Sequence, residues 1–97
     1  MQKKLKELRR ELLMINERDI FFQTKYKFER FAKVIEKMDL LGFDVSEVSF
    51  GCYLQDWDDE NFDRYCYRNK TEFIIKSLKV WANILSDLLK QLSEAID

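Results

Sequence analysis

Five carboxylates lie close together near the middle of the chain, within LQDWDDENFDRY at residues 54–65: Asp56, Asp58, Asp59, Glu60 and Asp63. Such a group can coordinate a divalent cation, imitate phosphate on a protein surface, or simply form a solvated turn. Calcium prefers carboxylate oxygens at fixed spacings along a loop. The spacing of these acids therefore tests whether they can form a calcium site.

The spacing excludes an EF-hand calcium site. Asp56, Asp58 and Glu60 match the first, third and fifth loop positions. The sixth position, which requires Gly for a sharp turn, is Asn61, and the twelfth, which requires a bidentate Glu, is Tyr67. The chain has no histidine, and two cysteines cannot complete a structural zinc site. We expect neither a metal nor a cofactor.

The same acids also suit a turn or a protein interface. Asp and Asn satisfy turn backbones through their own side chains, so a solvated turn needs no function. Carboxylates held on a rigid hairpin can also resemble phosphates to the basic groove of a partner protein. Nearby aromatic residues would supply apolar contact, because such residues often carry binding energy at interfaces. The predicted partner-binding residues are Tyr53, Asp56, Trp57, Asp58, Asp59, Glu60 and Asp63.

A second charged cluster, KKLKELRR at residues 3–10, has the opposite sign. Residues 1–38 have a charge balance of +5 and residues 39–65 one of -7, although the whole chain carries only -1. Bases on the outer face of a helix are usually solvated, but they also suit nucleic acid. Glu7 and Glu11 lie at i,i+4 pairing distance from several of them. The alternative, nucleic-acid-binding residues are Lys3, Lys4, Lys6, Arg9 and Arg10.

The chain has few residues suited to catalysis. Without histidine the chain lacks the commonest general base at neutral pH. Neither Cys52 nor Cys66 has a local motif for nucleophilic catalysis. We therefore expect a non-enzymatic protein. We also expect two free thiols and a cytoplasmic location, in the host cell if the protein is viral, because no stretch resembles a secretory signal or a membrane span.

Residues 1–42 are predicted to form one amphipathic helix, ending at Gly42 in a left-handed turn. We favour continuity, at ~57 Å, because neither Gly nor Pro interrupts the stretch. The alternative is two helices that meet near Asn16 to Asp19, either of which can cap a new helix. Two apolar stripes of 3-4-3 spacing, in different registers, carry the prediction: Leu5, Leu8, Leu12 and Ile15, then Phe28, Phe31, Ile35 and Met38.

Residues 47–68 are predicted to form a small antiparallel β-hairpin with the acidic stretch at its tip. Apolar and polar residues alternate from Val48 to Leu54, and the aromatic segment at 62–68 can pair with them. A competing prediction is a short helical turn at 44–47, since Asp44 and Glu47 have the spacing of a capping box. The aromatic run at residues 20–28 is expected in the core or a dimer interface instead of on an exposed stacking surface.

Residues 69–97 are predicted to form the C-terminal helix. Asn69 and Glu72 are spaced as its N-cap and N3 residues. Apolar residues follow at 4-3-4-3-4-3 spacing: Ile74, Leu78, Trp81, Leu85, Leu88, Leu92 and Ala95.

Together these elements predict a single α+β domain over residues 1–97, in the order α-β-β-α. The C-terminal helix would cover the hairpin and the long N-terminal helix. An all-α helical hairpin or coiled coil, with residues 44–68 in short helices and loops, is the alternative. A helix of ~57 Å is longer than the core that one chain of this size can build around it. We therefore expect a homodimer, in which a second copy covers the rest of the helix.

The expected function is binding to another macromolecule. The leading hypothesis is a small inhibitor of the phage or mobile-element type, which blocks a host nuclease or other nucleic-acid-handling complex through its acidic surface, as anti-CRISPR and anti-restriction proteins do. One alternative is a small nucleic-acid-binding regulator or antitoxin that uses the basic N-terminal helix. Another is a coiled-coil adaptor. We expect no membrane partner.

Overall fold

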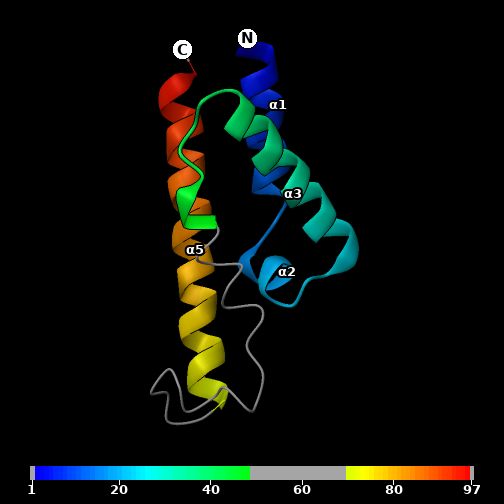
Figure 1. The fold of residues 1–97 in the computed structure, drawn as a ribbon, viewed down its shortest axis with the longest axis vertical. Coiled ribbons are helices and arrows are strands. Elements are labelled where there is room, and N and C mark those ends of the chain that lie inside the picture. Colours follow the sequence, from blue (N-terminus) through cyan, green and yellow to red (C-terminus); the bar gives the residue numbers. More distant parts are fainter. Residues whose placement is uncertain (1, 49–69, 97) are drawn as a thin grey trace.

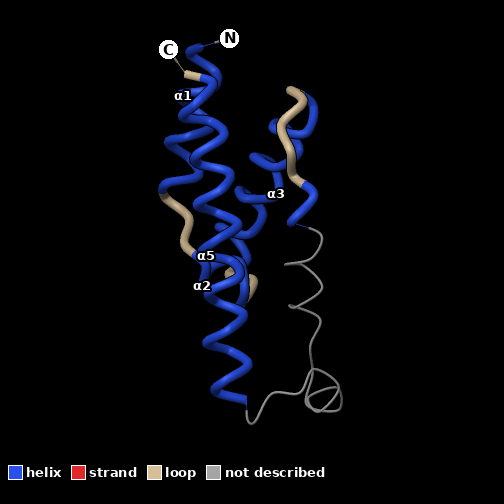
Figure 2. Tube along the Cα trace, turned by 90° about the vertical axis from the view of Figure 1, so that its left-hand side faces the viewer, coloured by secondary structure: helices blue, strands red, loops and turns tan. Residues whose placement is uncertain are grey.

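The computed structural model describes residues 2–48 and 70–96, most of which are helical. α5 is the longest element, and α1 lies antiparallel beside it, so α1 begins and α5 ends at the same end of the molecule (Figure 1). Turned by 90°, α1 and α5 lie together on one side and α3 on the other (Figure 2). The helices in chain order are α1 (Gln2–Leu13), α2 (Glu17–Phe21), α3 (Lys25–Leu40) and α5 (Lys70–Ala95).

The α+β prediction is wrong, because residues 2–48 and 70–96 contain helices and no strand. Glu47 and Val48, expected at the start of the hairpin, are helical together with Ser46. The Asp44 carboxylate accepts hydrogen bonds from the Ser46 hydroxyl at 2.7 Å and the Ser46 backbone N–H at 3.1 Å. This local cap agrees with the competing prediction of a short helical turn at 44–47 and accounts for the helical residues 46–48. The remainder of the predicted hairpin, residues 49–68, lies outside the described residues.

The prediction of one continuous helix over residues 1–42 is also wrong, because the chain reverses between residues 14 and 24. The Asn16 side chain accepts a hydrogen bond from the Asp19 N–H at 3.1 Å, and the Asp19 carboxylate accepts one from the Asn16 N–H at 3.2 Å. This reciprocal capping box starts α2. The Asp19 carboxylate also lies 3.6 Å from Lys27 Nζ of α3. Asp19 therefore links the start of α2 to α3.

The reversal removes the reason for expecting a homodimer. The longest dimension of the structure is 46 Å, shorter than the ~57 Å helix that was expected to outrun its own core. With the chain folded back at residues 14–24, both apolar stripes of the N-terminal half face the same core. Dimer formation stays a prediction that the fold of one chain does not require.

Left-handed residues end α2 and α3. Gln23 has a φ of 50° and Gly42 a φ of 91°. The Thr24 N–H, which follows Gln23, donates to the Asp19 carbonyl at 2.9 Å. The Phe43 N–H, which follows Gly42, donates to the Met38 carbonyl at 3.1 Å. Both are Schellman motifs, which satisfy the last carbonyls of a helix. The predicted stop at Gly42 is confirmed.

The core is closed by α5. Its Trp81 is fully buried and meets Phe31 of α3 edge to face, with ring centroids 5.9 Å apart. At the end of the molecule where α1 begins and α5 ends, the Gln2 side chain donates a hydrogen bond to the Ala95 carbonyl at 3.3 Å and so links α1 to α5. The predicted apolar stripes supply most of the buried residues, which are Leu5, Leu8, Leu12, Ile15, Ile20, Phe31, Val34, Met38, Trp81, Ile84, Leu85, Leu88 and Leu92.

Replacing Asn16 by Ala tests the helix break, because a capped break and a continuous helix predict changes of opposite sign in the free energy of unfolding. Loss of the cap should lower the free energy of unfolding by about 1 kcal/mol in urea denaturation. In a continuous helix the same change would raise it by up to ~0.7 kcal/mol, because Ala is the better helix former. Asn16→Ser keeps a capping oxygen and is the matched control, expected to stay close to the natural protein. Stabilisation by Ala would contradict the capping box.

Replacing Gly42 by Ala tests the left-handed end of α3. A left-handed conformation costs an L-residue about 1–2 kcal/mol, so the free energy of unfolding should fall by that amount. The added methyl would meet nothing within 4 Å, so the loss reports backbone strain alone. Gly42→Asn should recover part of the loss, because Asn tolerates this region better. An unchanged thermal midpoint for the Ala variant would argue against the left-handed stop.

Candidate functional site

The predicted acidic site lies outside the described residues. All seven predicted partner-binding residues fall in the gap between residues 48 and 70, namely Tyr53, Asp56, Trp57, Asp58, Asp59, Glu60 and Asp63. Cys52 and Cys66 lie in the same gap. The structure therefore bears on the alternative site, the bases of the N-terminal helix.

Helix α1 presents three of these bases together on its outer side. Lys6 lies three residues after Lys3 and four before Arg10, and all three side chains are exposed, so they share one surface. Arg9 is half-buried, and Lys4 is exposed one turn before the buried Leu8, so these two bases lie closer to the apolar stripe of α1.

Lys3 and Arg10 lie on a stripe of α1 with Glu7 and Met14 at 4-3-4 spacing, and all four side chains are exposed. Glu7, Arg10 and Met14 of this stripe line a pocket of about 300 Å³, together with Glu11 of α1 and one residue of α3. Of the five predicted bases, Arg10 is therefore the one that lines the pocket between α1 and α3.

The α3 residue in that pocket is Arg30. In a continuous helix Arg10 and Arg30 would lie about 30 Å apart, at 1.5 Å per residue. The reversal at residues 14–24 places both guanidinium-bearing side chains on the wall of one pocket. A basic site that is dispersed along the sequence is therefore assembled by the turn.

Helix α3 extends this basic surface. Arg30 shares a 4-3-4 stripe with Tyr26, Lys33 and Lys37, and both lysines are exposed. Lys33 and Lys37 therefore continue along α3 from the pocket that Arg30 lines. We name the resulting surface the α1/α3 basic face; its residues are Lys3, Arg10, Arg30, Lys33 and Lys37.

The bases of this face form no close ion pair with a described carboxylate. In the part of the chain that the structure describes, no carboxylate lies within the 4.0 Å ion-pair distance of any of its five bases. Glu7 and Glu11, expected to pair with bases on α1, line the pocket without forming such a pair. Glu29 and Glu36 are also exposed on α3, one turn before and one turn after Lys33, so four acids accompany the five bases and the local balance is about +1.

An exposed aromatic ring stands at one end of the same face. Tyr26 is 69% exposed, and Arg30 Cζ lies 5.6 Å from the centroid of its ring, within cation–π distance. Phe22 is 58% exposed as well, while Ile20 is fully buried. This run was predicted to lie in the core or in a dimer interface: Ile20 lies in the core, Phe22 and Tyr26 are exposed in the single chain, and the dimer interface stays a prediction.

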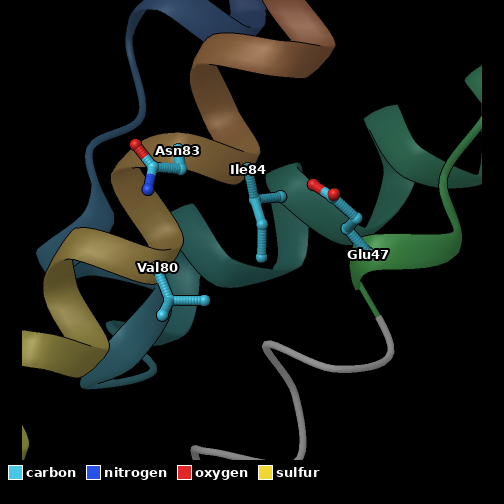
Figure 3. A pocket seen from close by; sticks show the side chains of 4 residues that line it. All are labelled: Glu47, Val80, Asn83 and Ile84. Carbon is cyan, nitrogen blue, oxygen red and sulfur yellow. The ribbon is translucent and has the colours of Figure 1, made fainter.

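A second pocket, of about 330 Å³, lies between α5 and the helical residues after α3 (Figure 3). Val80, Asn83 and Ile84 line it from α5, and Glu47 lines it from the opposite side (Figure 3). These described residues supply one carboxylate, one amide and two aliphatic side chains. They include no cation to hold an anion and no base next to a nucleophile, so they define no catalytic arrangement.

The segment that carries Glu47 is held on α5 by Gln91. The Asp44 N–H donates to Gln91 Oε1 at 3.0 Å, and Gln91 Nε2 donates to the Asp44 carbonyl at 2.9 Å. The two hydrogen bonds from Ser46, first from its hydroxyl and then from its N–H, lower the pKa of the exposed Asp44 carboxyl. Asp44 is therefore engaged in local structure, as a cap and a docking point.

Metal and membrane sites find no support in residues 2–48 and 70–96. No group of three or more Cys, Asp or Glu side chains there is placed to hold a metal ion. None of the helices in this part of the chain combines the length and the apolar character that crossing a lipid bilayer requires.

Comparison with known proteins gives no match: no family model, no curated protein and no solved structure is significantly similar to this chain. The functional argument therefore rests on the residues themselves.

Sequence reasoning missed three of the five residues of the basic face. Arg30, Lys33 and Lys37 are spaced along one stripe with Tyr26, a signal that the sequence already contains. The assumption of one continuous helix hid it, because it placed this stripe far from Lys3 and Arg10. The capping pair at Asn16 and Asp19 was the signal that could have brought the two stripes together.

Proposed function

We propose that this protein is a non-enzymatic nucleic-acid-binding protein, of the regulator or antitoxin type, that contacts phosphates through the α1/α3 basic face. One observation carries the proposal: the chain reversal sets Arg10 and Arg30 on one pocket, with no carboxylate of the described residues in ion-pair range. Lys3, Lys33 and Lys37 extend the same face along two helices.

The size and the charge of the face suit a nucleic-acid backbone. The stripe from Tyr26 to Lys37 is about 16 Å long at 1.5 Å per residue. That length corresponds to about five phosphates of one strand at 3.4 Å each. Lysines and arginines that contact phosphates release condensed counterions, which drives binding at low salt. The acidic balance of residues 39–65 would repel the same ligand and so orient it toward the basic face.

The proposal includes a cytoplasmic site of action. Nucleic acid is accessible there, and the two thiols predicted from the sequence would remain reduced. Cys52 and Cys66 have no part in the proposed binding surface, which is built entirely from α1 and α3.

The salt dependence of binding tests the proposal. Fluorescence anisotropy of a labelled oligonucleotide, titrated at several NaCl concentrations, should give an affinity that falls linearly on logarithmic axes. Lys33→Gln with Lys37→Gln should weaken binding and reduce the slope by about 0.7 per lost contact on a single strand, or 0.9 on a duplex. Both lysines are exposed, so the thermal midpoint should change little.

Lys79→Gln with Lys90→Gln is the matched control. These lysines are exposed on α5 and lie outside the basic face, and their loss changes the net charge equally. The control should bind with nearly the natural salt slope. Equal weakening by both pairs would mean that net charge, and not this face, governs binding. Failure of the natural protein to bind any oligonucleotide at low salt would overturn the proposal.

The acidic stretch supports a second candidate function, inhibition of a nucleic-acid-handling enzyme by a phosphate-like protein surface. Its support is the sequence, which puts five carboxylates within residues 56–63. Reversing all five to Lys should abolish capture of a host protein partner, identified by affinity purification and mass spectrometry, if the acids make the contact. If the variant with five lysines still captured the partner, this candidate function would be contradicted. A variant with the charges of the α1/α3 basic face reversed would serve as the control.

A further inference from the structure

We infer that Tyr26 and Arg30 form a stacking site for an unpaired base, so that the ligand of the basic face is single-stranded nucleic acid. This inference rests on the proposed function and specifies its ligand class. It starts from an aromatic side chain that the fold leaves unburied. Tyr26 is 69% exposed although three buried residues, Phe31, Val34 and Met38, follow it on the same helix.

The ring lies against a cation. The Arg30 guanidinium carbon lies 5.6 Å from the ring centroid, and the two residues are one turn apart on α3. A cation–π contact at an exposed site contributes about 0.5–1 kcal/mol, so it favours this arrangement of the two side chains. Tyr26 thus presents a ring with most of its surface in water beside a guanidinium group, and both can stack on a base.

The ring adjoins the phosphate-binding surface. Arg30 lines the pocket that also contains Arg10 and Met14, and Met14 is 57% exposed. Lys33 and Lys37 continue along the helix from the same stripe. A strand whose phosphates follow these lysines would bring a base to Tyr26 at the end of the stripe.

The arrangement distinguishes single strands from duplexes. In a duplex the faces of the bases are covered by their neighbours, so a surface ring gains nothing by lying beside them. Unpaired bases can turn out and stack on aromatic rings or on guanidinium planes, and this is how proteins bind single strands with little sequence preference. Lysines alone would contact either ligand. The Tyr26–Arg30 pair is the feature that selects the unpaired one.

The test compares three probes by fluorescence anisotropy: a single strand of about twelve nucleotides, its duplex, and the same strand with abasic sites. Tyr26→Leu should weaken binding to the single strand by about 5- to 100-fold, with an unchanged salt slope. Tyr26→Phe keeps the ring and should bind like the natural protein. Neither change should affect the duplex or the abasic strand, and thermal unfolding of each variant confirms that α3 is intact.

The outcomes separate this inference from the proposed function. If Lys33→Gln with Lys37→Gln weakens binding but Tyr26→Leu does not, the basic face stands and the stacking site is overturned. If Tyr26→Leu weakens binding to the abasic strand equally, the ring contacts no base, and the inference fails. A change of sedimentation coefficient caused by Tyr26→Leu alone would assign the ring to an interface between copies of this chain and would also overturn it.

Discussion

Asp19 is the residue on which the arrangement of the described helices depends. Its carboxylate accepts the Asn16 N–H and lies in ion-pair range of Lys27, and its carbonyl accepts the Thr24 N–H. A nearly buried charge needs such partners, since an unpaired one would be costly to remove from water. One side chain and one carbonyl thus join the start of α2, the end of α2 and the first turns of α3. These contacts hold α2 against the start of α3.

The reversal serves packing and surface chemistry at once. It turns the apolar stripes of α1 and α3 toward Trp81 and its neighbours on α5, which buries Phe31 against the indole ring. The polar stripes of the same two helices must then lie together on the outside. Because both stripes are rich in bases, the core geometry by itself concentrates positive charge. No separate structural element is needed to build the basic face.

Much of the helical content could be predicted from residue spacing, and the failures have identifiable causes. The 3-4 stripes located α1, α3 and α5 because they are long enough for the periodicity to be unambiguous. The break at Asn16 was given only as the alternative to a continuous helix, because neither Gly nor Pro interrupts the stretch, whereas the paired capping hydrogen bonds of Asn16 and Asp19 stabilise a new helix start. The strand expected from Val48 onward had only a short alternation to support it, and the Asp44 cap favoured a helix at its first residues.

The pairing of α1 with α5 has a consequence for the order in which the protein can fold. Gln2 and Ala95, which are joined by a hydrogen bond, are 93 positions apart in the chain. During synthesis, α1 and α3 emerge before α5, with the row of leucines on α1 uncovered, and they cannot complete the core that contains Trp81. Such long-range closure is slow relative to local helix formation and leaves apolar surface available to chaperones or to aggregation. The nascent chain is therefore vulnerable in the interval before α5 is made.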